Sequence, residues 1–245
     1  MKHAFTLMMV LALASAVRLI HVLTFVLPLL ATAAAAQTPP SMSQISSYSG
    51  LHLAAHEGNV GVIRKLAADG ADLDARDGSG RTPAHIAAFA SNSSALRALA
   101  EAGADMNALE NQRYDIVTIA AVANDPELMS LAIELGNRPD LVTSIYQGTA
   151  LIAAAHLGHD EVVRRLIEAG APLDHVNNLG WTALLEAIIL GDGGPDHTAT
   201  VRALVEAGAN ITIGDRNGVT PLQHAQRRGY KEMENIIQSA FTDRD

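Results

Sequence analysis

Two clusters of side chains in this sequence could bind a metal ion or transfer protons. The first, at residues 156–161, places two histidines three positions apart and follows them with Asp160 and Glu161. Two histidines on one helical face are a common arrangement of zinc ligands. Gly158 lies between them, however, and a glycine that ends a helix would separate the two rings. We therefore interpret this cluster as structural.

The second cluster consists of Asp192, Asp196 and His197, in a glycine-rich stretch at 191–198. Carboxylate and imidazole groups bind divalent cations, but their spacing here lacks the alternating ligands of a calcium loop. We expect a solvated loop. A metal-binding or enzymatic protein that uses residues 191–198 remains an alternative.

Other catalytic signatures are missing from the sequence. It contains no nucleophile-elbow, phosphate-loop or dinucleotide-binding motif. It also contains no cysteine, which excludes thiol catalysis, zinc–thiolate sites and disulfides. We therefore expect a protein that is not an enzyme, with no catalytic residues, no metal and no cofactor.

The charge of the chain bears on the class of its partner. There are 17 Lys and Arg residues against 26 Asp and Glu residues, so the formal net charge is -9. An acidic protein repels phosphate backbones, and no dense basic run compensates for this. We expect a protein partner and no nucleic acid.

The elements that position these side chains follow from an internal repeat. A Gly-Ala-Asp series recurs with variants at residues 70, 103, 136, 170 and 208, which are 33 to 38 residues apart. A Thr-Pro-Ala-His series runs in the same register at 82, 149, 182 and 220. Thr82 and Pro83 suit the start of a helix, and Ala87 and Ala88 keep that helix thin.

These series resemble the ankyrin repeat, and the match is closest over the ten residues 154–163. The resemblance implies an all-α solenoid of about six helix–turn–helix units with short β-turn tips, in which stacking buries the apolar faces. It also implies that His52 and His85 hydrogen-bond the backbone of the turns. The ankyrin-repeat domain is expected over residues 47–245. Its units are expected at about 44–76, 77–109, 110–143, 144–176, 177–214 and 215–245.

Two units depart from the pattern. The third has Asp115 in place of the threonine and Asn137 in place of the alanine of Gly-Ala-Asp. The fifth carries about five extra residues within 191–198, which we expect between its two helices.

Partners of ankyrin proteins bind the concave face that is formed by the turn tips and the first helices, as the resemblance implies. The aligned positions of this face are apolar at the centre and charged at the ends, which is the anatomy of a protein interface. Trp181, the only tryptophan, is its most distinctive residue. A simpler reading is that Ile189 and Leu190 pack beneath the insertion. The expected partner-binding residues are Phe89, Tyr114, Tyr146, His156, Leu157, Asn178, Trp181, Ile189 and Leu190.

Residues 1–36 are almost wholly apolar and end in an alanine run before Gln37, which is typical of a signal peptide cleaved after Ala36. Arg18 opens a second charge-then-apolar segment, so translation starts at either Met1 or Val17. A membrane anchor is the alternative to cleavage. Residues 37–46 are expected to form a flexible linker.

We therefore expect a non-catalytic binding module that is periplasmic or secreted, is monomeric and contacts the membrane only during export. A secreted effector that acts on a host protein is a further alternative. The sequence does not identify the partner.

Overall fold

The computed structural model describes residues 38–242, and within that range it contains helices and turns but no β-strand. The expected signal peptide at residues 1–36 lies outside the described residues. A short helix, α3 (Met42–Ser47), precedes six helix–turn–helix units. Units 1 to 6 are α4 (Gly50–Glu57) with α5 (Val60–Ala68), α6 (Pro83–Phe89) with α7 (Ser93–Ala102), α8 (Ile116–Ala123) with α9 (Pro126–Glu134), α10 (Ala150–Leu157) with α11 (Asp160–Glu168), α12 (Ala183–Ile189) with α13 (Pro195–Glu206), and α14 (Pro221–Arg228) with α15 (Lys231–Thr242).

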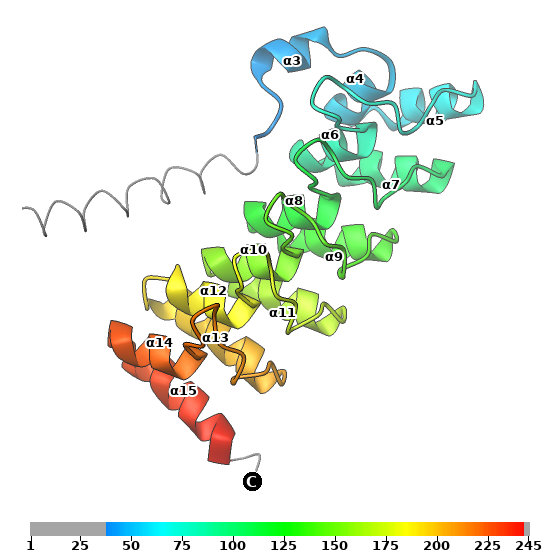
Figure 1. The fold of residues 1–245 in the computed structure, drawn as a ribbon. Coiled ribbons are helices and arrows are strands. Elements are labelled where there is room, and N and C mark those ends of the chain that lie inside the picture. The colour runs from blue at the N-terminus through cyan, green and yellow to red at the C-terminus, as the bar shows by residue number, and fades with distance from the viewer. Residues whose placement is uncertain (1–37, 243–245) are drawn as a thin grey trace, which may run out of the picture. The chain divides into compact units, whose positions relative to one another are not determined.

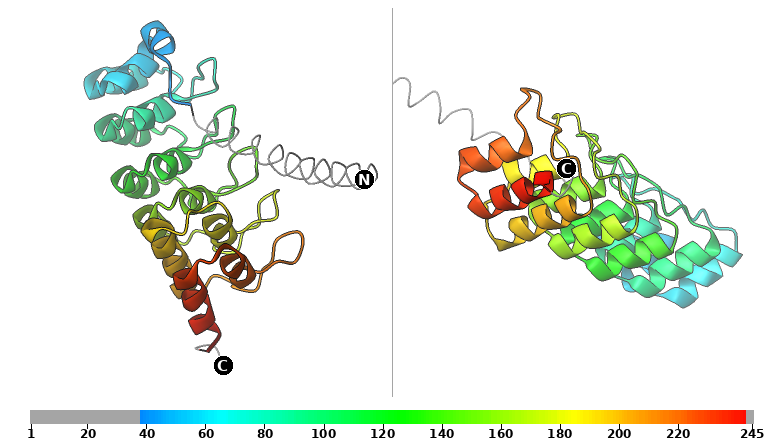
Figure 2. Two further views of the ribbon diagram at one scale, coloured as in Figure 1. Left: turned by 90° about the vertical axis from the view of Figure 1, so that its left-hand side faces the viewer. Right: turned by 90° about the horizontal axis from the view of Figure 1, so that it is seen from below.

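The units stack in chain order within the part that the structure describes (Figure 1). Each first helix packs against the first helix of the next unit, from α4 through to α14. The turn that precedes the first helix of each unit is here called the tip of that unit. These tips project together along one side of the stack (Figure 2). The expected all-α organisation is confirmed. None of the described helices has the length and apolar character to span a membrane.

Paired alanines form much of the contact surface between the first helices of units 1 to 4. Small side chains let two helix backbones approach closely, so each helix can cover its neighbour without a cavity. The alanines concerned are all at most 3% exposed: Ala54, Ala55, Ala87, Ala88, Ala120, Ala121, Ala154 and Ala155. Larger side chains from the second helices, such as Leu99 and Leu166, complete the core.

The two repeat histidines occupy the positions expected of them. His52 Nε2 lies 3.0 Å from the carbonyl oxygen of Arg81, and His85 Nε2 lies 3.1 Å from that of Tyr114. Each ring therefore donates to the tip that follows in the chain. Desolvation by burial lowers the pKa of His85 from 6.5 to about 4.

The two departures in unit 3 compensate for each other. Asp115 caps helix α8 by accepting from the backbone N–H of Thr118 at 2.8 Å. Asn137 donates to Asp115 Oδ2 at 2.9 Å and accepts from the backbone N–H of Val117 at 2.9 Å. Both side chains are buried, and burial raises the pKa of Asp115 despite these hydrogen bonds. The amide of Asn137 thus satisfies a carboxylate that would otherwise be buried with fewer donors.

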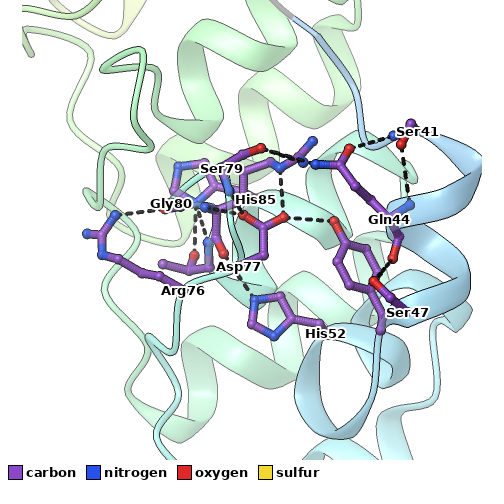
Figure 3. Close-up of polar contacts among 12 residues, drawn as sticks. Ser41, Gln44, Ser47, His52, Arg76, Asp77, Ser79, Gly80 and His85 are labelled. Carbon is purple, nitrogen blue, oxygen red and sulfur yellow. Dashed lines mark hydrogen bonds and ion pairs between the residues drawn. The ribbon is translucent and has the colours of Figure 1, made fainter.

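Helix α3 closes the tip of unit 2 (Figure 3). Gln44 donates to Ser79 Oγ at 3.2 Å, and the hydroxyl of Tyr48 donates to Asp77 Oδ2 at 2.9 Å. Asp77 also forms a buried ion pair with Arg81, whose Nε lies 2.9 Å away. Much of the segment expected as a linker is therefore a helix, because its polar side chains find partners in unit 2.

The insertion of unit 5 adds helix as well as loop. Only residues 190–194 connect α12 to α13, and Pro195 begins a twelve-residue helix. His197, expected in a loop, lies in the first turn of this helix and donates from Nε2 to the carbonyl oxygen of His156, 3.1 Å away. Its Nδ1 faces Asp192 Oδ1 at 3.1 Å.

Similar bonds recur between other units. Asn92, His159 and Tyr230 each donate to a carbonyl oxygen of the preceding unit, in the last turn of its first helix or just after it. The insertion therefore changes which residue reaches the preceding unit, but it preserves the contact.

We predict that Asn137→Ala lowers the free energy of unfolding by about 2 to 4 kcal/mol, because Asp115 and the Val117 N–H both lose a buried partner. Asp115→Thr together with Asn137→Ala recreates the Thr149 and Ala171 combination of unit 4. In urea unfolding, the free energy of unfolding of this double variant should exceed the value expected from the sum of the two single substitutions by at least about 1 kcal/mol. Strict additivity would contradict the pairing.

We also predict that acid destabilises the fold through His85. Its folded pKa of about 4 lies below the ordinary 6.5, so stability is full above pH 6.5 and falls as the pH drops toward 4. The loss between pH 7 and pH 4.5 should be about 2 to 3 kcal/mol. The His85→Gln variant carries the residue type that unit 6 has at this position, Gln223. Its loss of unfolding free energy between pH 7 and pH 4.5 should be smaller than that of the wild type by about 2 to 3 kcal/mol. Equal losses in the two proteins would show that His85 is not the cause.

Candidate functional site

The tips of successive units are joined by backbone hydrogen bonds. Asn111 donates to the carbonyl oxygen of Ser79, Ser144 to that of Arg113, and Asn178 to that of Tyr146, at 2.9 to 3.1 Å. This continuous edge fixes the spacing of the side chains that the tips carry. The tip of unit 4 closes with a bridge between Thr143 and Gly148, one residue wider than the Asn177 to Trp181 closure of unit 5.

Several tip residues adopt a backbone conformation that is unusual for their type. Arg113 has a φ of 67°, Ser144 of 61° and Gln147 of 55°, in the left-handed region that favours glycine. In units 2, 5 and 6 a glycine stands where unit 3 has Arg113. Such strain costs about 1 kcal/mol or more per residue and concentrates at functional sites. The unusual tips thus belong to units 3 and 4.

Exposed apolar side chains lie at the tips of units 4 and 5. Ile145 is 64% exposed, and Leu179 occupies the corresponding tip of unit 5. Val142 and Val176, which we did not single out from the sequence, are also exposed and lie next to these tips. An apolar surface of this kind, surrounded by polar residues, is typical of an interaction site.

Eight of the nine expected partner-binding residues are at least partly exposed. Leu157, Asn178 and Leu190 are exposed, whereas Phe89, Tyr146, His156, Trp181 and Ile189 are half-buried. Tyr114 differs, because it is only 6% exposed and belongs to the core. Burial raises the pKa of the Tyr114 hydroxyl to about 12. A pattern of aligned positions cannot reveal this, since the burial comes from the neighbouring units.

Trp181 is fixed at the base of the unit 5 tip. Asn177 Oδ1 accepts from the backbone N–H groups of Leu179 and Trp181, both at 3.0 Å. The Asn177 N–H in turn donates to the carbonyl oxygen of Trp181. The main chain that carries the tryptophan is therefore rigid, which lowers the entropy cost of a contact made by its ring.

A buried carboxylate lies beneath this part of the surface. Glu186 is 3% exposed, accepts from Asn177 Nδ2 at 2.8 Å and faces His156 Nδ1 at 3.1 Å. The contact holds the imidazole of His156 in one orientation on the surface of α10. We did not predict Glu186 from the sequence. The available signal was a charged residue at a position where units 2, 3 and 4 have Ile86, Ile119 and Ala153.

In both clusters considered as metal sites, the histidine side chains are engaged in contacts with other groups of the protein. His159 Nδ1 donates to the carbonyl oxygen of Ala121, while His156 faces Glu186, so the two rings have different partners. Both ring nitrogens of His197 are in contact with oxygen acceptors. Among residues 38–242, no group of three or more His, Asp or Glu side chains is arranged to hold a metal ion.

Comparisons with known proteins agree with this architecture. Two sequence profiles match, "Ankyrin repeats (3 copies)" over residues 117–215 and "Ankyrin repeats (many copies)" over residues 51–100. YahD of Escherichia coli strain K12, described as an ankyrin repeat protein, is 33% identical over 190 residues, which cover 77% of this chain and 94% of the relative.

Solved structures give the same result. An ankyrin repeat domain from Acinetobacter baumannii AYE is 43% identical with a TM-score of 0.72, covering 78% of this chain and 96% of that domain. The ankyrin repeat domain of Bcl-3, a member of the IκB protein family, is 26% identical with a TM-score of 0.71, covering 79% of this chain and 86% of that domain. With its six stacked units and these relatives, the chain belongs to the ankyrin-repeat family.

Proposed function

We propose that this chain is an exported, non-catalytic module that holds a protein partner on the concave surface of units 3 to 5. Ankyrin repeats are protein-interaction units, which supports a binding role. The observation that carries the location is that exposed apolar side chains at the tips of units 4 and 5 lie next to the strained tips of units 3 and 4. Strain is retained where the surrounding structure and the function require it.

The surface has the composition of an interaction centre. Trp181, Tyr146 and Leu190 provide large contact areas, and aromatic residues dominate the binding energy of protein interfaces. His156 adds a polar group that Glu186 holds in place, so its exposed edge is available for one hydrogen bond to the partner. A rigid polar contact within an apolar area supplies specificity rather than affinity.

The proposal of export rests on residues 1–36 alone, whose apolar run and alanine-rich end suit a cleavable signal peptide. A periplasmic or secreted binding protein without cysteine needs no oxidative folding step, so this composition is compatible with that location.

We predict that Trp181→Ala weakens capture of the periplasmic partner by about tenfold or more, because the indole is the largest side chain of the proposed contact. The melting temperature should change little, since the ring is only half-buried. Val62→Ala, which removes an exposed apolar side chain from α5, is the matched control. If the Trp181→Ala variant captures the partner as strongly as the Val62→Ala control does, the proposed location of the binding surface is wrong.

We also predict that the protein recovered from the periplasm or medium begins at Gln37, as cleavage after Ala36 requires. N-terminal sequencing of the exported form measures this directly. Sequencing of the precursor, made while export is blocked, distinguishes a start at Met1 from one at Val17. A full-length chain that stays with the membrane fraction would favour the anchor instead.

A further inference from the structure

The concave surface of unit 6 is rich in arginine, although the chain as a whole carries a formal net charge of -9. Arg216 lies in the unit 6 tip, and Arg227 and Arg228 form the end of helix α14. All three side chains belong to exposed residues. The position of these charges relative to unit 5 suggests what kind of partner the surface receives.

Two of the arginines reach back to unit 5 and bracket helix α12. Arg216 donates to the carbonyl oxygen of Asn178, and a side chain at Gly180 would collide with Arg216. Arg228 donates to the carbonyl oxygen of Ile189, at the other end of α12, and its guanidinium lies 5.9 Å from the centre of the Tyr230 ring. Each contact uses part of a guanidinium that has five N–H donors.

The apolar side chains of unit 5 lie between these two charges. Trp181 precedes α12 on the side of Arg216, and Leu190, 38% exposed, follows α12 on the side of Arg228. The surface thus alternates a cation, an apolar helix and a second cation.

The third arginine provides the free charge. Arg227 occupies on α14 the position that His156 has on α10 and Ile189 on α12. Within residues 38–242, Arg227 has no ion pair, whereas Arg202 and Lys231 of the neighbouring helices are paired with Glu232 and Glu234.

Two acidic side chains of units 5 and 6 are in contact with histidines. Asp215 contacts His224 at 3.1 Å, and Asp192 of the insertion contacts His197. The positive charge on the face of α14 is therefore left for a carboxylate that comes from outside the chain.

We infer that the concave surface of units 5 and 6 binds an acidic peptide segment of the partner, with an apolar side chain next to a carboxylate. An apolar side chain of the segment lies against Leu190, and the carboxylate next to it pairs with Arg227 through charge-assisted hydrogen bonds. The segment continues along α12 to Trp181 at the other end of that helix. This inference rests on the proposed function and adds the chemistry of the partner. Phosphate polymers fit less well, because the area between the arginines is largely aliphatic.

The test is a selection of random twelve-residue peptides on the exported protein, followed by titration of synthetic peptides. Trp181 is the only tryptophan, so its fluorescence reports binding at this surface directly. We expect enrichment of peptides with Asp or Glu within two positions of Leu, Ile or Phe. Replacing that carboxylate by its amide should weaken binding by about tenfold.

Charge reversal provides the matched pair of variants. Arg227→Glu should weaken the acidic peptides and select basic ones, while Arg202→Glu, on helix α13, should leave the selection unchanged. Arg227→Glu should retain the wild-type melting temperature, and Arg202→Glu, which loses the exposed ion pair with Glu232, should lower it only slightly.

Three outcomes would overturn the inference. Enriched peptides that need Trp181 but carry no acid would refute the acidic partner and leave the proposed function intact. Equal binding of a single-stranded oligonucleotide, competing with the peptides, would show a general anion surface. Peptides that bind with equal strength to the Trp181→Ala variant would refute the proposed location itself.

Discussion

Each helical pair of this chain has an apolar face that only the neighbouring pair can bury. The paired alanines of the first helices make this possible, because they let consecutive helices approach until little space remains between the backbones. Every other feature of the molecule depends on that spacing. The tips align, the carbonyl groups at the helix ends come within reach of the next unit, and the exposed side chains form one surface.

The polar contacts between neighbouring units recur at the same place in the repeat, but different residue types make them. An asparagine, two histidines and a tyrosine each reach a carbonyl oxygen of the preceding unit: Asn92, His159, His197 and Tyr230. A carbonyl at a helix end needs a donor but does not specify which one, so sequence can vary there. The same freedom lets unit 5 accept an insertion, since its lengthened helix brings another donor to the same place.

Much of the fold was predictable from the sequence, because the repeat is a local pattern with a fixed spacing. The paired alanines, the roles of His52 and His85 and the place of the insertion followed from that register. The partnership of Asp115 with Asn137 and the burial of Glu186 did not, because each depends on which side chain lies opposite in space. Tyr114 illustrates the same limit, since aligned positions share a backbone location but not their neighbours.

The charged surfaces of the end units have a consequence for how separate molecules meet. A stack of similar units ends in surfaces that resemble the interfaces inside it, and a head-to-tail contact between such ends produces open filaments. At the first end, helix α5 exposes the charged residues Arg64 and Lys65. The last end is a helix with lysine, glutamate and asparagine on its surface. Polymerisation is thus opposed by charged side chains at both ends of the stack.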